Sequence, residues 1–216
     1  MSLINFSSKF NYIVEDKVNS IAFTFGRFQP PTIGHEKLFD KVKSVSDGEF
    51  RIYSSHSEDK KNPLDYKTKM NFLKKMFPQY KRNIKISKLR TALEIASSLY
   101  DEGFTKLQFI VGDDRVRSFE SLLKKYNGEK SKQHGYYNFQ EIEVVSAGKR
   151  DPDAEGVTGM SASKMRKLAV DGDYKNFKKG LPSNFKDGEK LYKILRTKLG
   201  ISEMINFKEW MKLWRK

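Results

Sequence analysis

Short apolar runs alternate with amphipathic stretches along most of this chain of 216 residues, and this alternation is the feature that most constrains its fold. A short apolar run bounded by Gly or polar residues is typical of a buried strand, whereas apolar residues spaced three and four apart indicate a helix. Strands and helices that follow one another in turn predict a parallel sheet with helices on both faces. We therefore expect an α/β fold in which a C-terminal helical extension follows the sheet.

The apolar runs predict five strands, over residues 20–25, 50–54, 84–87, 106–111 and 141–145. Helices are expected over residues 34–46, 65–77, 91–103 and 114–126, and a further one from about residue 161. Three of these helices have apolar stripes that we expect to face the core: Leu38, Val42 and Val45; Met70, Leu73 and Phe77; and Ala92, Ala96 and Leu99. We place one domain over residues 1–180 and the helical extension over residues 181–216.

The predicted fold also indicates where a ligand should bind. Sites in parallel sheets lie beyond the carboxyl ends of the strands, near the point where the strand order reverses. The loops of interest are therefore those that follow Phe25, Ser54, Val111 and Val145. All four are rich in Gly, Pro or charged residues, which suits a turn that meets a polar ligand.

Composition excludes several kinds of site. There is no Cys, which excludes disulfides, thiolate metal sites and a Cys nucleophile. The three His residues, His35, His56 and His134, are too few for a metal site built mainly of imidazoles. We interpret His56 and His134, which lie in polar segments, as surface residues or as residues that support a site from behind.

The net charge of +15 favours anionic partners, such as nucleotides, phosphorylated metabolites, nucleic acid or anionic membrane. Nucleic-acid binding would need a basic stripe interleaved with exposed aromatic residues, and the aromatic residues here fall mostly on predicted core faces. No apolar run approaches the roughly 20 residues that span a bilayer. The N-terminal segment also lacks the pattern of a signal peptide, so we expect a cytoplasmic protein without a membrane segment.

The segment GRFQPPTIGH, residues 26–35, follows the first predicted strand and contains the first candidate site. Gly26 permits a tight turn, and the two prolines restrict the loop. Gly34 lets a phosphate approach the backbone where a helix begins, and the free N–H groups and positive dipole end there favour an anion. His35, Thr32 and Arg27 are further donors. The alternative is a Pro-rich turn with a His that only packs against a helix.

A second candidate site is GMSASKMR, residues 159–166, which follows the last predicted strand. Ser161 can cap a helix, and Ser163 then exposes its hydroxyl in the first turn. Lys164 and Arg166 add cationic donors at the positive end of that helix. Hydroxyls, N–H groups and a forked guanidinium suit a polyphosphate chain, although an ordinary capped helix has the same pattern.

Two shorter segments add further candidates. Gly112 and Asp113 end the strand over residues 106–111, where the Asp can either accept hydrogen bonds from a ribose or base edge or cap a helix. The basic stretch KKNPL, residues 60–64, is followed by Lys67 and Lys69. This stretch either closes over phosphates or forms an ordinary solvated loop.

The sequence resembles the HIGH-motif nucleotidyltransferase superfamily, which includes the cytidylyltransferases, pantetheine-phosphate adenylyltransferase and nicotinamide mononucleotide adenylyltransferase. Thr32-Ile33-Gly34-His35 matches its H/T-x-G-H signature, and residues 160–166 are similar to its I-S-S-T-x-x-R signature. The lead-in GRFQP most resembles the nicotinamide mononucleotide adenylyltransferases of the archaeal type. The segment VGDDR, residues 111–115, resembles a G-x-D or G-D-D segment of the family, and Lys69 stands where the adenylyltransferases often have Arg. The resemblance covers roughly residues 20–180.

This resemblance implies a Rossmann-like fold and an enzyme that transfers a nucleotidyl group, with adenylyl favoured, from a nucleoside triphosphate to a phosphorylated small-molecule acceptor. Pyrophosphate would be released, and Mg²⁺ would arrive with the triphosphate rather than at a metal site of the protein. The implied catalytic residues are Thr32, His35 and Arg166. The implied nucleotide-binding residues are Gly26, Arg27, Phe28, Gly34, His35, Gly112, Asp113, Ser161, Ser163, Lys164 and Arg166.

Several alternatives stay open. ATP with nicotinamide mononucleotide and a cytidylyltransferase reaction on a sugar- or alcohol-phosphate are both compatible with the motifs. A non-catalytic nucleotide- or nucleic-acid-binding protein is the remaining class. Asp151 and Asp153 either contact Mg²⁺ indirectly or form a turn. The apolar face over residues 206–214, with both Trp residues of the chain, predicts either a terminal helix that docks on the domain or a contact in a homo-oligomer.

Overall fold

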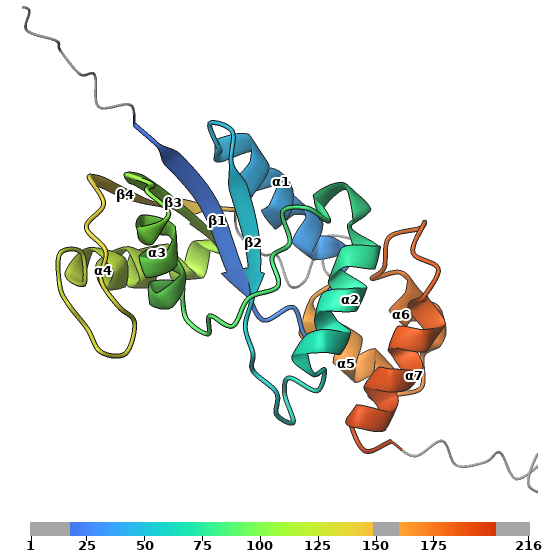
Figure 1. Cartoon of the computed structure of the whole chain (residues 1–216). Coiled ribbons are helices and arrows are strands. Elements are labelled where there is room, and N and C mark those ends of the chain that lie inside the picture. Colours follow the sequence, from blue (N-terminus) through green and yellow to red (C-terminus); the bar gives the residue numbers. More distant parts are fainter. Residues whose placement is uncertain (1–17, 149–159, 202–216) are drawn as a thin grey trace, which may run out of the picture.

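Four strands form one parallel sheet in this computed structural model, which describes residues 18–148 and 160–201 (Figure 1). The strands are β1 (Ser20–Gly26), β2 (Phe50–Ser54), β3 (Lys106–Val111) and β4 (Glu141–Ser146). Their order is β2-β1-β3-β4, and all neighbours are parallel. The chain adds β2 on one side of β1 and β3 on the other, so the strand order reverses beside β1. The α/β, Rossmann-like prediction is confirmed.

Helices follow each strand, as the alternating pattern predicts. The α-helices are α1 (Glu36–Val45), α2 (Tyr66–Met76), α3 (Ala92–Asp101), α4 (Val116–Lys125), α5 (Ala162–Val170), α6 (Tyr174–Lys178) and α7 (Gly188–Lys198). Three short 3₁₀ turns are η1 (Ile33–His35), η2 (Pro78–Tyr80) and η3 (Asp113–Arg115). Within the described part of the chain, no helix is both long and apolar enough to cross a bilayer.

The two faces of the sheet are buried by different helices. Alternate residues of β1 point to opposite faces, so Ala22 joins one cluster of buried side chains while Ile21 and Phe23 join the other. The Ala22 cluster includes side chains of α1, α2, α5, α6 and α7, whereas the Phe23 cluster includes those of α3 and α4. Figure 1 shows these two groups of helices on opposite sides of the strands. Helices therefore cover both faces, as a parallel sheet requires.

The strand that we predicted over residues 84–87 is wrong. Ile84 forms only an isolated parallel bridge with Ile52 of β2, where Ile52 N–H donates to Asn83 and Lys85 N–H donates to Ile52. Beyond Lys85 the chain leaves the sheet edge, and Ile86 is 70% exposed. The predicted strand therefore does not continue to Ile86, because the described part of the structure does not bury this side chain.

The predicted helices are present, with differences in detail. Residues 34–46 begin as η1 and continue as α1, in which Phe39 is fully buried beside Val42 although we had not placed it on the core stripe. Thr91 caps α3 by accepting from Glu94 N–H at 3.1 Å. The Glu94 carboxylate accepts from Arg90 N–H at 2.7 Å, one residue earlier than in the usual capping box.

Candidate active site

The loop after β1 folds back over Gly26, the last residue of that strand. Phe28 has a φ of +47°, which lies in the left-handed region that Phe rarely adopts. Its ring lies so close to Gly26 that a Cβ on this glycine would meet ring atoms at 2.6 Å. Phe28 packs edge-on against His35 and Phe39, at centroid distances of 4.9 and 5.5 Å. Gly26 is therefore required by a close approach, and the buried Phe28 ring supports His35.

His35 ends η1, and Thr32 holds its ring. Nδ1 of His35 accepts a hydrogen bond from Thr32 N–H at 2.9 Å and lies 3.1 Å from Thr32 Oγ1. Because Nδ1 is an acceptor, the hydrogen of the neutral ring is on Nε2, the nitrogen that can donate to a phosphate oxygen. Thr32 is 1% exposed and His35 is 8% exposed. The hydrogen bond from Thr32 N–H fixes the tautomer, and burial of both residues restricts the direction of the ring.

Gln29 connects this loop to the segment after β2, a role that we did not predict. Its side-chain amide donates to the carbonyls of Leu64 and Ser57 at 2.7 and 3.1 Å, and its Oε1 accepts from Leu64 N–H at 3.0 Å. The residue is 1% exposed. An amide among apolar residues and prolines is a signal of such a backbone anchor, since a buried amide must find partners.

Arg166 brings the second motif to the first. Ser161 caps α5 by accepting from Lys164 N–H at 3.1 Å, which leaves Ser163 and Arg166 on its first two turns. Arg166 Nη1 donates to the carbonyl of Gln29 at 2.5 Å, and Nη2 donates to Ser163 Oγ at 3.0 Å. The guanidinium therefore bridges α5 and the loop after β1, with Gly34 close to α5 as well. A Cβ on Gly34 would lie 3.4 Å from the carbonyl oxygen of Met160.

A second guanidinium, that of Arg27, lies near enough to Arg166 to affect its pKa. Burial, and after it the nearby charge of Arg27, hold the pKa of Arg166 below its ordinary value. Arg27 itself is exposed. Two guanidinium groups that repel each other at the end of a strand would be stabilised by an anion between them.

The expected nucleoside side of the site lies at the ends of β3 and β4. Gly112 precedes η3, and Asp113 accepts a hydrogen bond from Ser146 Oγ at 3.0 Å. Ser146 Oγ in turn accepts from Gly148 N–H at 3.0 Å. Asp113 remains exposed. Since β3 is the neighbour of β1, Asp113 and the loop after β1 open at the same edge of the sheet.

Lys69, on α2, is buried below the loop that follows β2. Its Nζ donates to the carbonyl of Ser55 at 2.5 Å and lies 5.9 Å from the ring centroid of Tyr66. Burial lowers the pKa of Lys69 to about 8, while the charges of Asp65 and Glu58 act in the opposite direction. The Oγ of Ser55 is also buried and has no hydrogen-bond partner among the described residues.

The two other His residues are half-buried and take part in local contacts. His56 stacks on Tyr66 at a centroid distance of 3.8 Å, and its Nε2 forms a 2.8 Å hydrogen bond with the carbonyl of Ser87. His134 packs edge-on against Tyr126 at 4.7 Å. Both therefore serve local packing.

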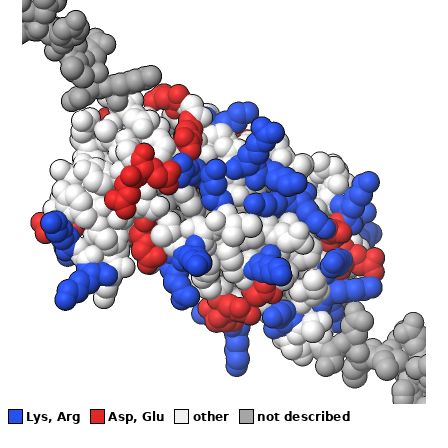
Figure 2. Space-filling model, viewed as in Figure 1, with Lys and Arg blue, Asp and Glu red and all other residues white. Residues whose placement is uncertain are grey.

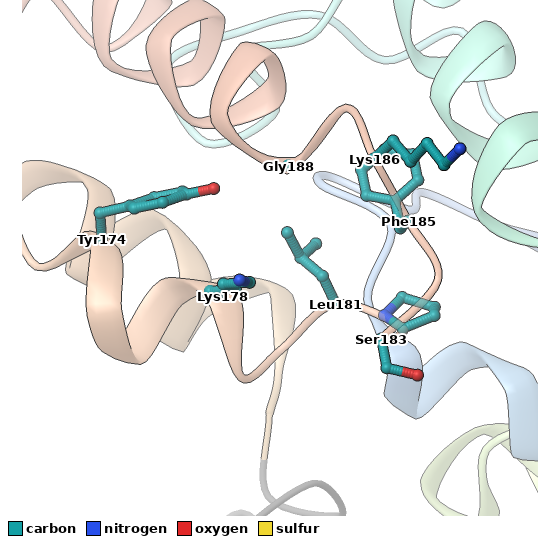
Figure 3. Close-up of a pocket in the computed structure, with 8 residues that line it drawn as sticks. Tyr174, Lys178, Leu181, Ser183, Phe185, Lys186 and Gly188 are labelled. Carbon is teal, nitrogen blue, oxygen red and sulfur yellow. The ribbon is translucent and has the colours of Figure 1, made fainter.

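A cavity of about 360 Å³ lies between α6 and α7 rather than at the strand ends (Figure 3). It is lined by Tyr174, Lys178, Leu181, Pro182, Ser183, Phe185, Lys186 and Gly188. No residue that we expected in the site lines it. On the face shown in Figure 2, Lys and Arg side chains are dense over the half of the molecule that holds α1, α2 and α7.

Some predicted features lie outside the described residues. These are Asp151, Asp153 and Gly159 in the loop before α5, and the apolar face over residues 206–214. Within residues 18–148 and 160–201, no three His, Asp or Glu side chains are grouped so as to hold a metal ion.

Comparisons with known proteins found a matching family model and similar solved structures. A family model described as cytidylyltransferase-like matches residues 23–167, from within β1 to just beyond Arg166. A solved structure described as a putative nicotinate-nucleotide adenylyltransferase from Vibrio parahaemolyticus aligns with 81% of this chain and 98% of that chain, at a TM-score of 0.48 and 13% sequence identity. No curated protein sequence matches the chain. The span of the family model contains both candidate motifs.

Proposed function

The chain belongs to the cytidylyltransferase-like family, and from this premise we propose that it is a nucleotidyltransferase. It would transfer the nucleotidyl group of a nucleoside triphosphate to a phosphorylated small molecule. The observation that carries the proposal is the hydrogen bond between Arg166 and the carbonyl of Gln29, two residues 137 positions apart that belong to the two motifs. The contact supports a site in which hydroxyl, imidazole and guanidinium donors would together bind a polyphosphate.

The proposed reaction needs no nucleophile from the protein. An oxygen of the acceptor phosphate attacks the α-phosphorus in line and forms a new P–O bond. The bond from the α-phosphorus to the oxygen that bridges to the β-phosphate breaks, and pyrophosphate leaves with that electron pair. Catalysis then consists of positioning the two phosphates and neutralising the charge on the reacting group.

Each residue has a role that fits its place in the structure. His35 donates from Nε2 to the α-phosphate region, and Thr32, which is buried against Nδ1, orients the ring. Ser163 and Arg166 hold the β- and γ-phosphates, with Arg27 opposite. The remaining nucleotide contacts are proposed for Gly26, Phe28, Gly34, Gly112, Asp113, Ser161 and Lys164. Mg²⁺ belongs to the substrate in this scheme, because it is bound by phosphate oxygens and water.

The substrate pair that we favour is ATP with nicotinamide mononucleotide. The support is the resemblance of the lead-in GRFQP to the archaeal nicotinamide mononucleotide adenylyltransferases. Cytidylyl transfer to a sugar- or alcohol-phosphate uses the same phosphate motifs and differs only in what borders the base and the acceptor. The same experiment therefore decides between the two.

That experiment is pyrophosphate release with Mg²⁺, in which ATP, CTP, GTP and UTP are each combined with a panel of phosphorylated acceptors. His35→Ala is the test variant, and His56→Ala is the matched control, because His56 packs on Tyr66 outside the loop after β1. We expect release with one pair, a loss of about 100-fold or more in kcat for His35→Ala, and little change for His56→Ala.

Two results would contradict the proposal. Absence of release with every pair would favour a protein that binds nucleotides without turnover. An equal loss in both variants would show that His35 only supports the fold. Release with CTP and an alcohol-phosphate, lost in His35→Ala, would keep the reaction and replace the substrate pair.

A further inference from the structure

Gly180, in the turn between α6 and α7, contacts the Thr32–His35 segment through its backbone. Its carbonyl accepts a hydrogen bond from Ile33 N–H at 2.9 Å. Ile33 is the first residue of η1, so its N–H has no partner inside that turn. A residue of the C-terminal helices therefore satisfies this donor and holds η1 in place.

The other side of Gly180 packs against α5. A Cβ at this position would lie 2.2 Å from Sδ and 3.0 Å from Cε of Met165. Met165 is fully buried and directly precedes Arg166. The missing side chain of Gly180 thus allows α5 and the turn after α6 to approach more closely than any other residue type would permit.

These contacts connect the two motifs at two points, which are the Arg166–Gln29 hydrogen bond and Gly180. Gly180 is bonded to Ile33, and Ile33 is four residues from Gln29 in the same loop. Gln29 accepts from Arg166 at 2.5 Å, and Arg166 follows Met165, which packs against Gly180. The distance between the two phosphate motifs is therefore fixed twice, once by the Arg166 guanidinium and once by Gly180.

We propose that Gly180 is a positioning residue that holds the two phosphate-binding motifs at the separation that a triphosphate requires. This inference rests on the proposed nucleotidyl transfer, because it assigns both motifs to one triphosphate. Gly180 has no side chain and does not touch substrate; it acts through Ile33 and Met165. The turn after α6 becomes part of the functional unit, although it is remote from the strand ends in the sequence.

A methyl group added at Gly180 tests its packing role, and the same change at Gly188 shows how much of the effect is a general loss of stability. In Gly180→Ala, either Met165 leaves its buried place or the turn moves away from η1, and both changes alter the spacing of the motifs. Gly188→Ala is the matched control, because its Cβ would meet Leu181 Cδ1 at 2.9 Å and Tyr174 Oη at 3.4 Å but would have no atom of Met165 or Ile33 within 4 Å.

A second variant removes the hydrogen bond without adding volume. Ile33→Pro eliminates the N–H donor, and Pro is well tolerated at the first position of a helical turn. A third, Gly180→Ala combined with Met165→Val, removes Sδ and Cε and makes room for the new methyl group. These variants keep the test decisive even if Gly180→Ala alone folds poorly.

The measurements are kcat and KM of pyrophosphate release, the melting temperature, and the Kd of Mg²⁺-tripolyphosphate by calorimetry. We expect kcat to fall by about 10- to 100-fold in Gly180→Ala and Ile33→Pro, in line with a displacement of about 1 Å. Gly188→Ala should stay within about twofold at a similar melting temperature, and Met165→Val should restore most of the turnover lost in Gly180→Ala.

The inference is overturned if Gly180→Ala and Gly188→Ala lose stability alike while both keep wild-type kcat. Absence of turnover in the wild type would instead refute the proposed reaction, and the inference would then be decided by tripolyphosphate binding. A Kd raised in Gly180→Ala and Ile33→Pro but not in Gly188→Ala supports it. Equal Kd values in the wild type and in these three variants overturn it.

Discussion

Lys69 shows how a single buried charge makes the stability of the fold depend on pH. Its ammonium group has no solvent exposure and donates to the Ser55 carbonyl, and burial lowers its pKa to about 8 from an ordinary value of 10.5. Below pH 8 the amine is charged in both the folded and the unfolded chain, so folding bears the full cost of burying the charge. As pH rises from 8 to 10.5, the folded protein loses the proton first, and this cost disappears.

We therefore predict that Lys69→Met changes the pH dependence of stability. Relative to this variant, the wild type should gain unfolding free energy between pH 8 and 10.5, by an amount on the order of 3 kcal/mol. Urea unfolding of both proteins at pH 7 and pH 10 measures the difference, in which the titration of other groups cancels. Lys67→Met, which removes an exposed amine from the same helix, is the control. A difference that is the same at both pH values for Lys69→Met would contradict the burial cost.

Among the elements, α5 is the helix whose first turn matters most for the proposed chemistry. Ser161 and Thr91 cap α5 and α3 with the same geometry, each accepting at 3.1 Å from the N–H three residues later. The two helices lie in different hydrophobic clusters, on opposite faces of the sheet. Only α5 presents Ser163 and Arg166 to the loop after β1. Loss of the α5 cap should therefore affect the proposed site, whereas loss of the α3 cap should affect only stability.

We predict that Ser161→Ala and Thr91→Ala each lower the unfolding free energy by about 1 kcal/mol. Only Ser161→Ala should also reduce kcat/KM, by about 10-fold, because fraying of the first turn moves Ser163 and Arg166. Chemical unfolding and steady-state kinetics on both variants give the comparison. Equal kinetic losses in the two would mean that the cap of α5 has no special link to the site.

The elements were predicted more completely than the contacts between them. Apolar periodicity and Gly positions were sufficient for four strands and for α1 to α5, since each depends on neighbours in the sequence. The same reasoning failed at Ile86, because only the tertiary structure decides whether an apolar residue at a sheet edge has something to pack on. The sequence motifs also predicted that Arg166 and His35 belong to one site. They did not predict the roles of Gln29 and Gly180. Their roles depend on backbone carbonyls and close approaches, which no side-chain pattern encodes.

At the scale of the whole molecule, the C-terminal helices share a core with the sheet. Leu191 and Leu195 of α7 are fully buried in the same cluster as Ala22 of β1. Phe185 packs against Phe72 of α2 at 6.2 Å, and Asp187 forms a 2.6 Å ion pair with Lys75. The boundary that we drew at residue 180 therefore cuts through a continuous set of contacts, and whether the two parts fold separately remains a prediction to test.

We predict that a chain ending at residue 180 does not unfold cooperatively. It lacks four buried side chains, Leu181, Leu191, Tyr192 and Leu195, each of which contributes about 1.5–3 kcal/mol when buried. Their sum is comparable to the whole stability of a typical domain, about 5–15 kcal/mol. Near-ultraviolet circular dichroism during heating should show one sharp transition for the full chain and none for the shortened one. A sharp transition in both would establish residue 180 as a domain boundary.

The bond between Arg166 and Gln29 also has a consequence for a chain that is still being synthesised. Gln29 leaves the ribosome long before Arg166, and β2 to β4 and α1 to α4 are all synthesised in between. A nascent chain that has reached the end of β4 has its sheet and its His35 but only the first of the two proposed phosphate-binding motifs. Nucleotide would thus be captured only by finished molecules, and each captured molecule would be withdrawn from the unfolded pool by mass action.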